Sequence, residues 1–379
     1  MTIAADSERP AHAQPAAELP VGDLLLDHVE LYVEDLDREA SEWTTRFGCT
    51  VVGSAGGAGA GFRSLALCQG RIVLVLTEGI DEGHPASLYT ALHGSGVGRI
   101  AMRTADVAAA FAYAVGRGAR PMAEPARLPG PGVVATATIA GFGDVVHTLI
   151  EREGTDCLPA GFEPVPSGSE AGPSATEAAG LEEIDHFAVC VRVGGLDEVV
   201  KCYQETLGFK EIFEERIVVG SQAMLSKVVQ SCKGDITFTI IQPDPEADPG
   251  QIDEFLKNHG GAGVQHIAFS SHDAVGSVRA LNRAGVDFLK TPGTYYQLLA
   301  QRVELMRHGL ESLREWNLLV DEDHGGQLFQ IFTRSTHPRR TLFFEVIERL
   351  GAETFGSSNI KALYEAVELE RLQQNASVR

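Results

Sequence analysis

The stretch LDHVELYVEDLDREASEWTTRFGC (residues 26–49) carries the pattern that decides the fold, because IDHFAVCVRVGGLDEVVKCYQETLGF (residues 184–209) repeats it. In each stretch an alternating run predicts a β-strand, apolar residues at three- and four-residue spacing predict a helix, and a glycine follows that helix. Two such stretches in a chain of 379 residues indicate an internal duplication.

A second pair of stretches extends the repeat. GVGRIAMRTADVAAAFAYAVGRGA (residues 96–119) matches GVQHIAFSSHDAVGSVRALNRAGV (residues 263–286), and both predict a strand followed by a helix. Further β-branched or alternating segments follow these openings, at residues 71–77, 133–139 and 235–241. We therefore expect an α+β fold of four βαβββ modules, arranged as two duplicated halves.

The segment LPAGFEPVPSGSEAGPSATEAAG (residues 158–180) is rich in Pro, Gly, Ser and Glu and has few large apolar residues to bury, which is typical of a linker. The first 22 residues have neither a basic start nor an apolar stretch, so they predict a flexible tail rather than a signal peptide. The expected organisation is a tail (1–22), an N-terminal half (23–157), a linker (158–180) and a C-terminal half (181–379).

Composition excludes several classes of function. The formal charge of −21 would repel phosphate backbones and anionic lipids, so we expect neither nucleic acid nor a membrane surface as a partner. No apolar run approaches the roughly 20 residues of a membrane helix. The cysteines form no C-x-x-C pair, which argues against a disulfide framework or a thiolate zinc site and favours a cytoplasmic location. They are Cys49, Cys68, Cys157, Cys190, Cys202 and Cys232.

The two halves differ at the positions where chemistry is expected. The C-terminal half carries His186 and His266 on its two opening strands, whereas the N-terminal half carries His28 and Arg99 at the corresponding places. A single histidine on a strand is most often a hydrogen-bonded core residue. Duplication would place the paired histidines on facing sheets, which favours a metal site in the C-terminal half and a structural role for the other half.

Such a metal site needs a third ligand, and Glu345 in TLFFEVIER is the candidate. Two phenylalanines precede it and Val-Ile follows, so it lies in a segment suited to burial. A buried unpaired carboxylate is costly, whereas a carboxylate bound to a cation is not. Two histidines and one carboxylate suit non-heme Fe(II) and O₂ chemistry.

Other motifs predict structure rather than chemistry. GSAGGAGAG (residues 53–61) lacks the Lys-Ser/Thr of a phosphate-binding loop and predicts a hairpin connection, while DEDHGG (residues 321–326) predicts a polar turn. His324 and His337 are expected to face solvent. SSNIKALYEAVELERL (residues 357–372) predicts a C-terminal helix, either packed on the core or covering the site as a lid.

Five motifs resemble signatures of the 4-hydroxyphenylpyruvate dioxygenase family, which has the vicinal oxygen chelate fold. They are GAGVQHIAF, FLKTPGTYY, LFQIFTRS, RTLFFEVIER and FGSSNIKALYEAVE, and the resemblance runs from about Asp27 to Arg371. The resemblance implies iron ligands at His186, His266 and Glu345. It also implies a substrate pocket with the polar residues Ser226, Gln251, Gln265 and Gln330, the aromatic residues Phe332, Phe343 and Phe355, and Asn359 on the C-terminal helix over the active site.

Three positions resemble the mandelate-forming branch of that family, the 4-hydroxymandelate synthases, rather than the homogentisate-forming one. They are Thr239 in TIIQP, where dioxygenases usually have P-I-N-E-P, and Ile360 and Tyr364 in SNIKALY, where they usually have G-N-F-K-A-L-F. A changed pocket beside the substrate ring and a new hydroxyl could turn the benzylic carbon toward the metal.

The resemblance thus implies a homodimeric Fe(II) enzyme that converts 4-hydroxyphenylpyruvate and O₂ to 4-hydroxymandelate and CO₂, as a step toward hydroxyphenylglycine for peptide antibiotics. Three alternatives stay open. They are a homogentisate-forming dioxygenase, a non-catalytic binding or resistance protein of the same fold, and an extradiol catechol dioxygenase.

Overall fold

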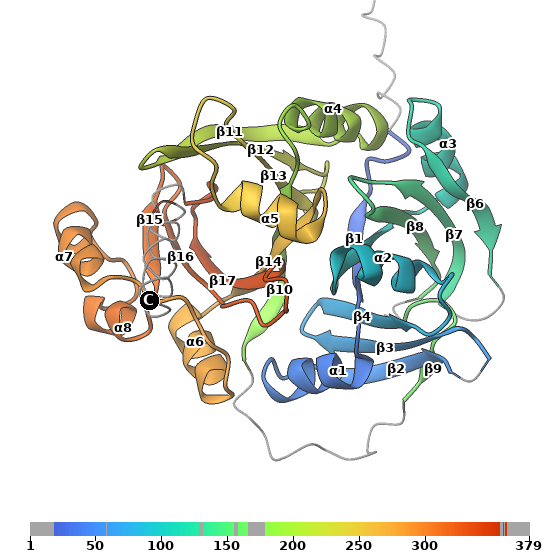
Figure 1. Cartoon of the computed structure of the whole chain (residues 1–379), viewed down its shortest axis with the longest axis horizontal. Helices are drawn as coiled ribbons and strands as arrows, with labels where there is room; N and C mark the ends of the chain where they lie inside the picture. The colour runs from blue at the N-terminus through green and yellow to red at the C-terminus, as the bar shows by residue number, and fades with distance from the viewer. Residues whose placement is uncertain are drawn as a thin grey trace, which may run out of the picture.

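The computed structural model describes residues 19–57, 59–128, 132–154, 158–165 and 179–356, together with residues 359 and 361. Two curled β-sheets lie side by side, each with helices packed against it (Figure 1). The first sheet has nine strands in the order β6-β7-β8-β5-β1-β4-β3-β2-β9. The second has eight strands in the order β11-β12-β13-β10-β14-β17-β16-β15.

The elements follow one another in the order that the repeats predict. The first half contains β1 (Leu25–Tyr32), α1 (Leu36–Thr45), β2 (Thr50–Gly56), β3 (Phe62–Gln69), β4 (Ile72–Gly79), α2 (Pro85–His93), β5 (Gly96–Arg103), α3 (Val107–Val115), β6 (Pro121–Arg127), β7 (Val133–Ala140), β8 (Val146–Arg152) and β9 (Glu163–Pro164). The second half contains β10 (Leu181–Cys190), α4 (Leu196–Leu207), β11 (Lys210–Val219), β12 (Gln222–Gln230), β13 (Thr237–Pro243), α5 (Gln251–His259), β14 (Gly263–Ser271), α6 (Ala274–Arg283), α7 (Gly293–Arg302), α8 (Leu310–Glu315), β15 (Leu319–Glu322), β16 (Gln327–Phe332) and β17 (Phe343–Leu350).

The predicted α+β architecture of four βαβββ modules is confirmed. In each half the two modules join through their opening strands, which pair antiparallel: β1 with β5, and β10 with β14. Each opening strand also pairs in parallel with the last strand of its own module. The sequence duplication is therefore a duplication of strand register as well.

Aspartates at equivalent positions begin the helix in three of the four modules. The side chains of Asp35, Asp106 and Asp273 accept hydrogen bonds from the backbone N–H three residues later, at 2.9 to 3.0 Å. These contacts satisfy N–H groups that the first helical turn leaves without partners. The repeated Asp thus explains why the chain turns from strand to helix at the same point of these three modules.

Several elements differ from the predicted pattern. Helices α2 and α5 lie between the modules of each half, and α7 and α8 enlarge the fourth module. Within the expected linker, Glu163 and Pro164 pair with β2 as the short edge strand β9. Within the expected tail, Val21 is buried in the core. The GSAGGAGAG segment joins the paired strands β2 and β3, as a hairpin connection should.

Strand alternation divides each curled sheet into two chemically distinct faces. Along β10, Phe187 and Val189 belong to the main core. Ala188 and Cys190 belong to a separate cluster with residues of β11–β13 and α5. Because successive side chains of a strand point to opposite faces, His186 shares its face with Ala188 and Cys190. The face that carries Phe187 and Val189 therefore packs in the main core, and we call it the outer face. The opposite, inner face carries His186.

Buried histidines join the two halves. The rings of His93 (α2) and His259 (α5) stack with centroids 4.2 Å apart, and His93 Nδ1 lies 2.7 Å from the carbonyl oxygen of His259. His147 Nε2 (β8) lies 2.6 Å from the Tyr203 hydroxyl (α4). The expectation that His337 faces solvent is wrong: it is buried, with Nδ1 3.2 Å from the carbonyl oxygen of Ser95. His324 is exposed, as expected.

Acidification from pH 7 to pH 5 is expected to weaken this junction. Burial lowers the pKa of His147 and of His259 to about 4, against about 6.5 in an unfolded chain. The unfolded chain thus binds these protons first, so stability is lost as the pH falls from about 6.5 toward 4, by at most about 3 kcal/mol per histidine. Thermal unfolding at both pH values should show a smaller loss for His147→Gln than for the wild type. Equal losses would contradict the assignment.

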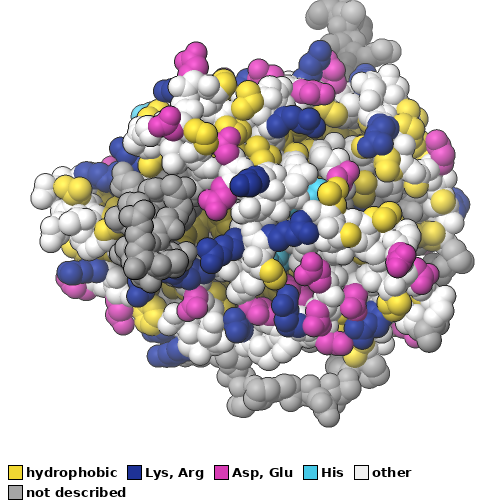
Figure 2. Space-filling model, viewed as in Figure 1, with side chains coloured by type: hydrophobic (Ala, Val, Ile, Leu, Met, Phe, Trp, Pro, Cys, Tyr) yellow, Lys and Arg dark blue, Asp and Glu magenta, His cyan; other side chains and the backbone are white. Residues whose placement is uncertain are grey.

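None of the helices among the described residues is long and apolar enough to cross a membrane. On the face drawn in Figure 2, acidic and basic side chains are interspersed rather than gathered by sign.

Candidate metal centre

His186, His266 and Glu345 meet on the inner face of the second sheet. Their ligand atoms all lie within 4.8 Å of one another, and all three residues are buried. Glu345 Oε2 is 3.4 Å from His186 Nε2 and 3.3 Å from His266 Nε2. Two ligands held at right angles about 2.1 Å from one ion are roughly 3 Å apart, so the spacing fits a single small cation.

Strand register explains this convergence. His186 on β10 pairs with Ala268 on β14, and Ala268 pairs with Glu345 on β17. His266 precedes Ala268 by two residues, which returns its side chain to the same face. The histidines thus lie on adjacent strands of one sheet, not on the facing sheets that the duplication suggested. Equivalent strands pair directly at the centre of each half, and that pairing makes them neighbours.

Electrostatics hold Glu345 and His266 in the forms that bind a metal, but favour a proton on His186. Burial raises the pKa of Glu345, but hydrogen bonding and charge from His186 and His266 outweigh burial and lower it to about 2. Burial lowers the pKa of His266, which favours the neutral imidazole. Burial lowers the pKa of His186, but hydrogen bonds and charge from Asp185 and Glu345 outweigh burial and raise it to about 9, so a metal ion bound there would displace a proton. Metal ligands must be deprotonated, and two imidazoles with one carboxylate form the donor set of non-heme Fe(II) sites. The residues present therefore fit Fe(II).

The two imidazoles are held in different ways. His186 Nδ1 lies 2.8 Å from Asp185 Oδ1, which leaves Nε2 directed at Glu345. Among the described residues His266 Nδ1 is buried without a hydrogen-bond partner. Its ring is held by stacking on Phe343 (4.9 Å between centroids) and by an edge contact with Phe332 (5.8 Å).

A chain of amides leads away from Glu345. Gln330 Nε2 donates to Glu345 Oε1 at 2.8 Å, and Asn359 Nδ2 donates to Gln330 Oε1 at 2.9 Å. The Tyr295 hydroxyl lies 3.1 Å from Asn359 Oδ1. Both amides are almost fully buried. Two expected pocket residues, Gln330 and Asn359, are thus brought to the metal ligand, and Tyr295 joins them. The FLKTPGTYY motif contains Tyr295, but nothing in the sequence singles it out.

One glycine allows these amide hydrogen bonds to form. Gly356 has a φ of +65°, and a Cβ on it would lie 2.2 Å from Gln330 Oε1. A side chain at this position would therefore displace the Gln330 amide. The glycine of the FGSSN motif is explained by this close approach.

The expected aromatic residues also surround the histidines. Phe355 makes an edge contact with His186, with ring centroids 5.2 Å apart and an interplanar angle of 88°. Phe332 and Phe343 contact His266 from β16 and β17. Together the three rings exclude water from the ligand atoms on several sides, which strengthens electrostatic interactions there.

Three further expected pocket residues are buried near these strands without a hydrogen bond to the triad. Ser226 on β12 pairs with Ile241 on β13, two residues beyond Thr239. Among the described residues the buried Thr239 hydroxyl has no hydrogen-bond partner. Gln265 lies where the register between β10 and β14 shifts by a residue. Such a bulge lets adjacent side chains depart from strict alternation.

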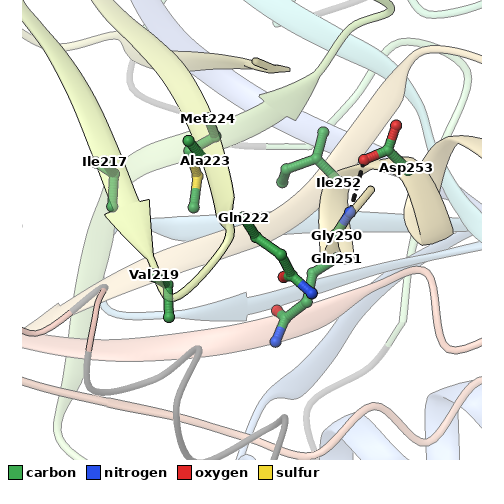
Figure 3. Close-up of a pocket in the computed structure, with 9 residues that line it drawn as sticks. All are labelled: Ile217, Val219, Gln222, Ala223, Met224, Gly250, Gln251, Ile252 and Asp253. Atoms are coloured by element: carbon green, nitrogen blue, oxygen red, sulfur yellow. Dashed lines mark hydrogen bonds between the residues drawn. The ribbon is translucent and has the colours of Figure 1, made fainter. Parts of the chain in front are cut away.

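Gln251 lies elsewhere, at the first turn of α5. It lines a narrow pocket with Gln222 and with apolar residues of β11 and β12. Figure 3 shows the side chains of Gln222 and Gln251 approaching each other from neighbouring elements. The described contacts do not connect Gln251 to the triad. Ile360 and Tyr364 lie outside the described residues, as does most of the expected C-terminal helix.

The N-terminal half has a different set of residues at the same positions. Register equates His28 with His186, Arg99 with His266 and Thr148 with Glu345. Arg99 forms an ion pair with Glu30, its cross-strand neighbour, at 3.2 Å. The positive guanidinium of Arg99 neutralises the negative carboxylate of Glu30, so no metal ion is needed to balance that charge. The asymmetry between the halves is thus a difference of ligands within one backbone arrangement.

A second group of possible ligands, Asp273, His308 and Glu348, also lies within 4.8 Å. Here Glu348 is already satisfied: it accepts the N–H of Ala274 at 2.7 Å and forms an ion pair with Arg307 at 2.9 Å. An arginine bound to the central carboxylate competes with any cation. We therefore interpret this group as a helix-capping network.

Both halves match known protein families. Residues 27–135 and 183–331 each match the Glyoxalase/Bleomycin resistance protein/Dioxygenase superfamily. A 4-hydroxyphenylpyruvate dioxygenase from Yarrowia lipolytica is 32% identical, over 92% of this chain and 92% of that protein. A probable 4-hydroxyphenylpyruvate dioxygenase 2 from Aspergillus fumigatus is also 32% identical, over 92% and 94%.

The chain belongs to the 4-hydroxyphenylpyruvate dioxygenase family. Its two halves have the vicinal oxygen chelate fold. Within this family, a solved structure of a triple mutant of 4-hydroxymandelate synthase from Streptomyces coelicolor is 41% identical, with a TM-score of 0.80. The match covers 91% of this chain and 98% of that chain. The resemblance of several motifs to this family is therefore confirmed.

Proposed function

We propose that this protein is an Fe(II)-dependent 4-hydroxymandelate synthase. It would convert 4-hydroxyphenylpyruvate and O₂ to 4-hydroxymandelate and CO₂, in the supply of hydroxyphenylglycine for peptide antibiotics. The observation that carries the metal chemistry is the buried triad of two imidazoles and one carboxylate. Family membership supports the substrate class, and the 41% identity to a 4-hydroxymandelate synthase supports the product.

Fe(II) would be held by His186 Nε2, His266 Nε2 and Glu345 Oε2. When bound, this ion would supply the oxidising chemistry for decarboxylation and hydroxylation, and positions at which a 2-oxo acid and O₂ could meet. A divalent ion bound by two neutral imidazoles and one carboxylate would give the site a net positive charge. That charge favours an anionic substrate despite the −21 of the whole chain.

The other side chains of the site would orient the substrate. Gln330 fixes Glu345 by donating to Oε1, so Oε2 is left to face the histidines. Phe332, Phe343 and Phe355 offer apolar surfaces for an aromatic ring. Thr239 supplies a buried hydroxyl that makes no hydrogen bond to any residue that the structure describes. A substrate polar group could satisfy it, and we propose this contact as one source of the choice of carbon.

A second candidate is the homogentisate-forming dioxygenase, and a specific observation favours it. The Yarrowia and Aspergillus relatives carry the name 4-hydroxyphenylpyruvate dioxygenase and align over nine-tenths of the chain. Both reactions use the same substrate class and metal, so the triad cannot distinguish them. The distinction lies in how the ring is held beside the metal.

Incubation of the purified protein with Fe(II), ascorbate, O₂ and 4-hydroxyphenylpyruvate is expected to yield 4-hydroxymandelate with stoichiometric CO₂. Liquid chromatography with mass spectrometry separates this product from homogentisate. Homogentisate as the sole product would refute the mandelate assignment but keep the family chemistry. Tight substrate binding without O₂ consumption would instead indicate a non-catalytic binding protein, and turnover of a catechol without CO₂ an extradiol dioxygenase.

We further propose a cytoplasmic homodimer with residues 23–157 and 181–379 as its two domains. Among the described cysteines, Cys49, Cys190, Cys202 and Cys232 are free, which agrees with a reducing compartment. The N-terminal domain would be structural, because Arg99, which is ion-paired with Glu30, stands at the position of His266, and Thr148 stands at the position of Glu345.

A further inference from the structure

Asp185 and Arg349 form a closed set of contacts behind the candidate ligand His186. Asp185 Oδ1 lies 2.8 Å from His186 Nδ1, across the imidazole from the ligand atom Nε2. Arg349 grips the same carboxylate with two donors: Nε to Oδ2 at 2.7 Å and Nη2 to Oδ1 at 2.9 Å. A bidentate arginine fixes both the position and the plane of a carboxylate.

The contacts continue from Arg349 to the aromatic ring on His186. Arg349 Nη1 donates to the carbonyl oxygen of Thr354 at 2.7 Å, and the guanidinium lies 5.1 Å from the centroid of the Phe355 ring. Phe355 in turn packs edge-on against His186. The path from His186 through Asp185, Arg349 and Phe355 thus returns to His186. Glu345 and Arg349 lie four residues apart on β17, so one strand supplies both a ligand and this support.

The N-terminal half contains the same arrangement, with no group of possible metal ligands among its described residues. Asp27 Oδ1 lies 2.7 Å from His28 Nδ1. Arg152 donates to Asp27 through Nε at 2.5 Å and Nη2 at 2.7 Å, and through Nη1 to the carbonyl oxygen of Leu158. The side chains of Asp27 and Arg152 are 1% and 2% exposed, against 14% and 22% for Asp185 and Arg349. A purely structural role should therefore matter more in the N-terminal half.

We propose that Asp185 and Arg349 are positioning residues that set the metal affinity of the site by holding His186 in the tautomer and orientation that direct Nε2 to the metal. The proposal rests on the metal site proposed above. Histidine ligands gain basicity and a fixed orientation when their second nitrogen donates to a carboxylate. His266 has no such partner among the described residues, so His186 is the ligand whose orientation this pair can control.

Asp185→Asn, with Asp27→Asn as its matched control, tests the proposal in the full-length, metal-free protein. Anaerobic titration with Co(II), followed by its visible absorption, reports on affinity and on ligand geometry. Asp185→Asn is expected to weaken Co(II) binding by about 10- to 100-fold and to change the absorption band. Asp27→Asn is expected to lower thermal stability at least as much, yet to leave both Co(II) readouts unchanged.

Unchanged Co(II) affinity and spectrum in Asp185→Asn would overturn the proposal, and so would an equal loss of affinity in Asp27→Asn. If Asp185→Asn does not fold, the pair Arg349→Lys and Arg152→Lys applies the same comparison, because lysine keeps the charge but loses the bidentate geometry. A wild type that binds no Co(II), or binding that survives His186→Gln, would refute the metal site itself. Those results differ from the failure of the positioning role alone.

Discussion

His186→Gln is expected to reduce bound iron to background and to lower turnover of 4-hydroxyphenylpyruvate by at least about 1,000-fold, because the substitution removes one of three protein ligands. The glutamine is polar and close in size, and it can still donate toward Asp185, so the fold should persist. Metal analysis after anaerobic loading with Fe(II), together with O₂ consumption, measures both effects.

The duplicated half supplies the control for this experiment. His28 Nδ1 lies 2.7 Å from Asp27 Oδ1, much as His186 Nδ1 lies 2.8 Å from Asp185 Oδ1. The positions of the other two ligands, however, are occupied by Arg99 on the adjacent strand β5 and by Thr148 on β8, which pairs with β5. His28→Gln should therefore leave iron content and turnover near the wild-type values. Iron retained by His186→Gln, or lost equally in both variants, would show that the metal lies elsewhere.

The repeat in the sequence was enough to predict the modules, and it singled out two of the three candidate ligands that the structure brings together. Strand–helix openings recur four times, and strand pairing follows from them because duplicated units pair through equivalent strands. Glu345 could be chosen because a lone carboxylate in an apolar strand has few explanations other than a cation. Local patterns carry this information, since each depends on residues close together in the chain.

Contacts between distant segments could not be predicted in the same way. His337 was expected at the surface but is buried against Ser95, 242 residues earlier. Tyr295 reaches Asn359 only because α7 folds beside the segment that follows β17. The placement of His186 and His266 on adjacent strands also depends on pairing, which a single sequence does not show. In each case a tertiary contact, rather than a local preference, decides the position.

Thr239→Val is expected to stabilise the substrate-free protein and yet impair its function. The buried Thr239 hydroxyl has no hydrogen-bond partner in the part of the chain that the structure describes. Such a group costs about 1–3 kcal/mol, so a nearly isosteric valine should raise the free energy of unfolding by about 1 kcal/mol. The corresponding position of the N-terminal half is Val75, which shows that the module accepts valine there. Substrate affinity should fall by about 10-fold, because a site built to hydrogen-bond loses its donor.

The opposite signs of these two effects make the test specific. Substitution of a residue that only packs would lower both the stability of the protein and its substrate affinity. A buried hydroxyl that binds the substrate instead destabilises the substrate-free protein, because it has no partner until the substrate is bound. Thermal unfolding measures the first effect, and anaerobic substrate titration with product analysis measures the second. Thr239→Ser keeps the hydroxyl and should retain the wild-type affinity and product. If Thr239→Val binds and converts substrate like the wild type, Thr239 takes no part in holding the substrate, and the choice between mandelate and homogentisate depends on other residues.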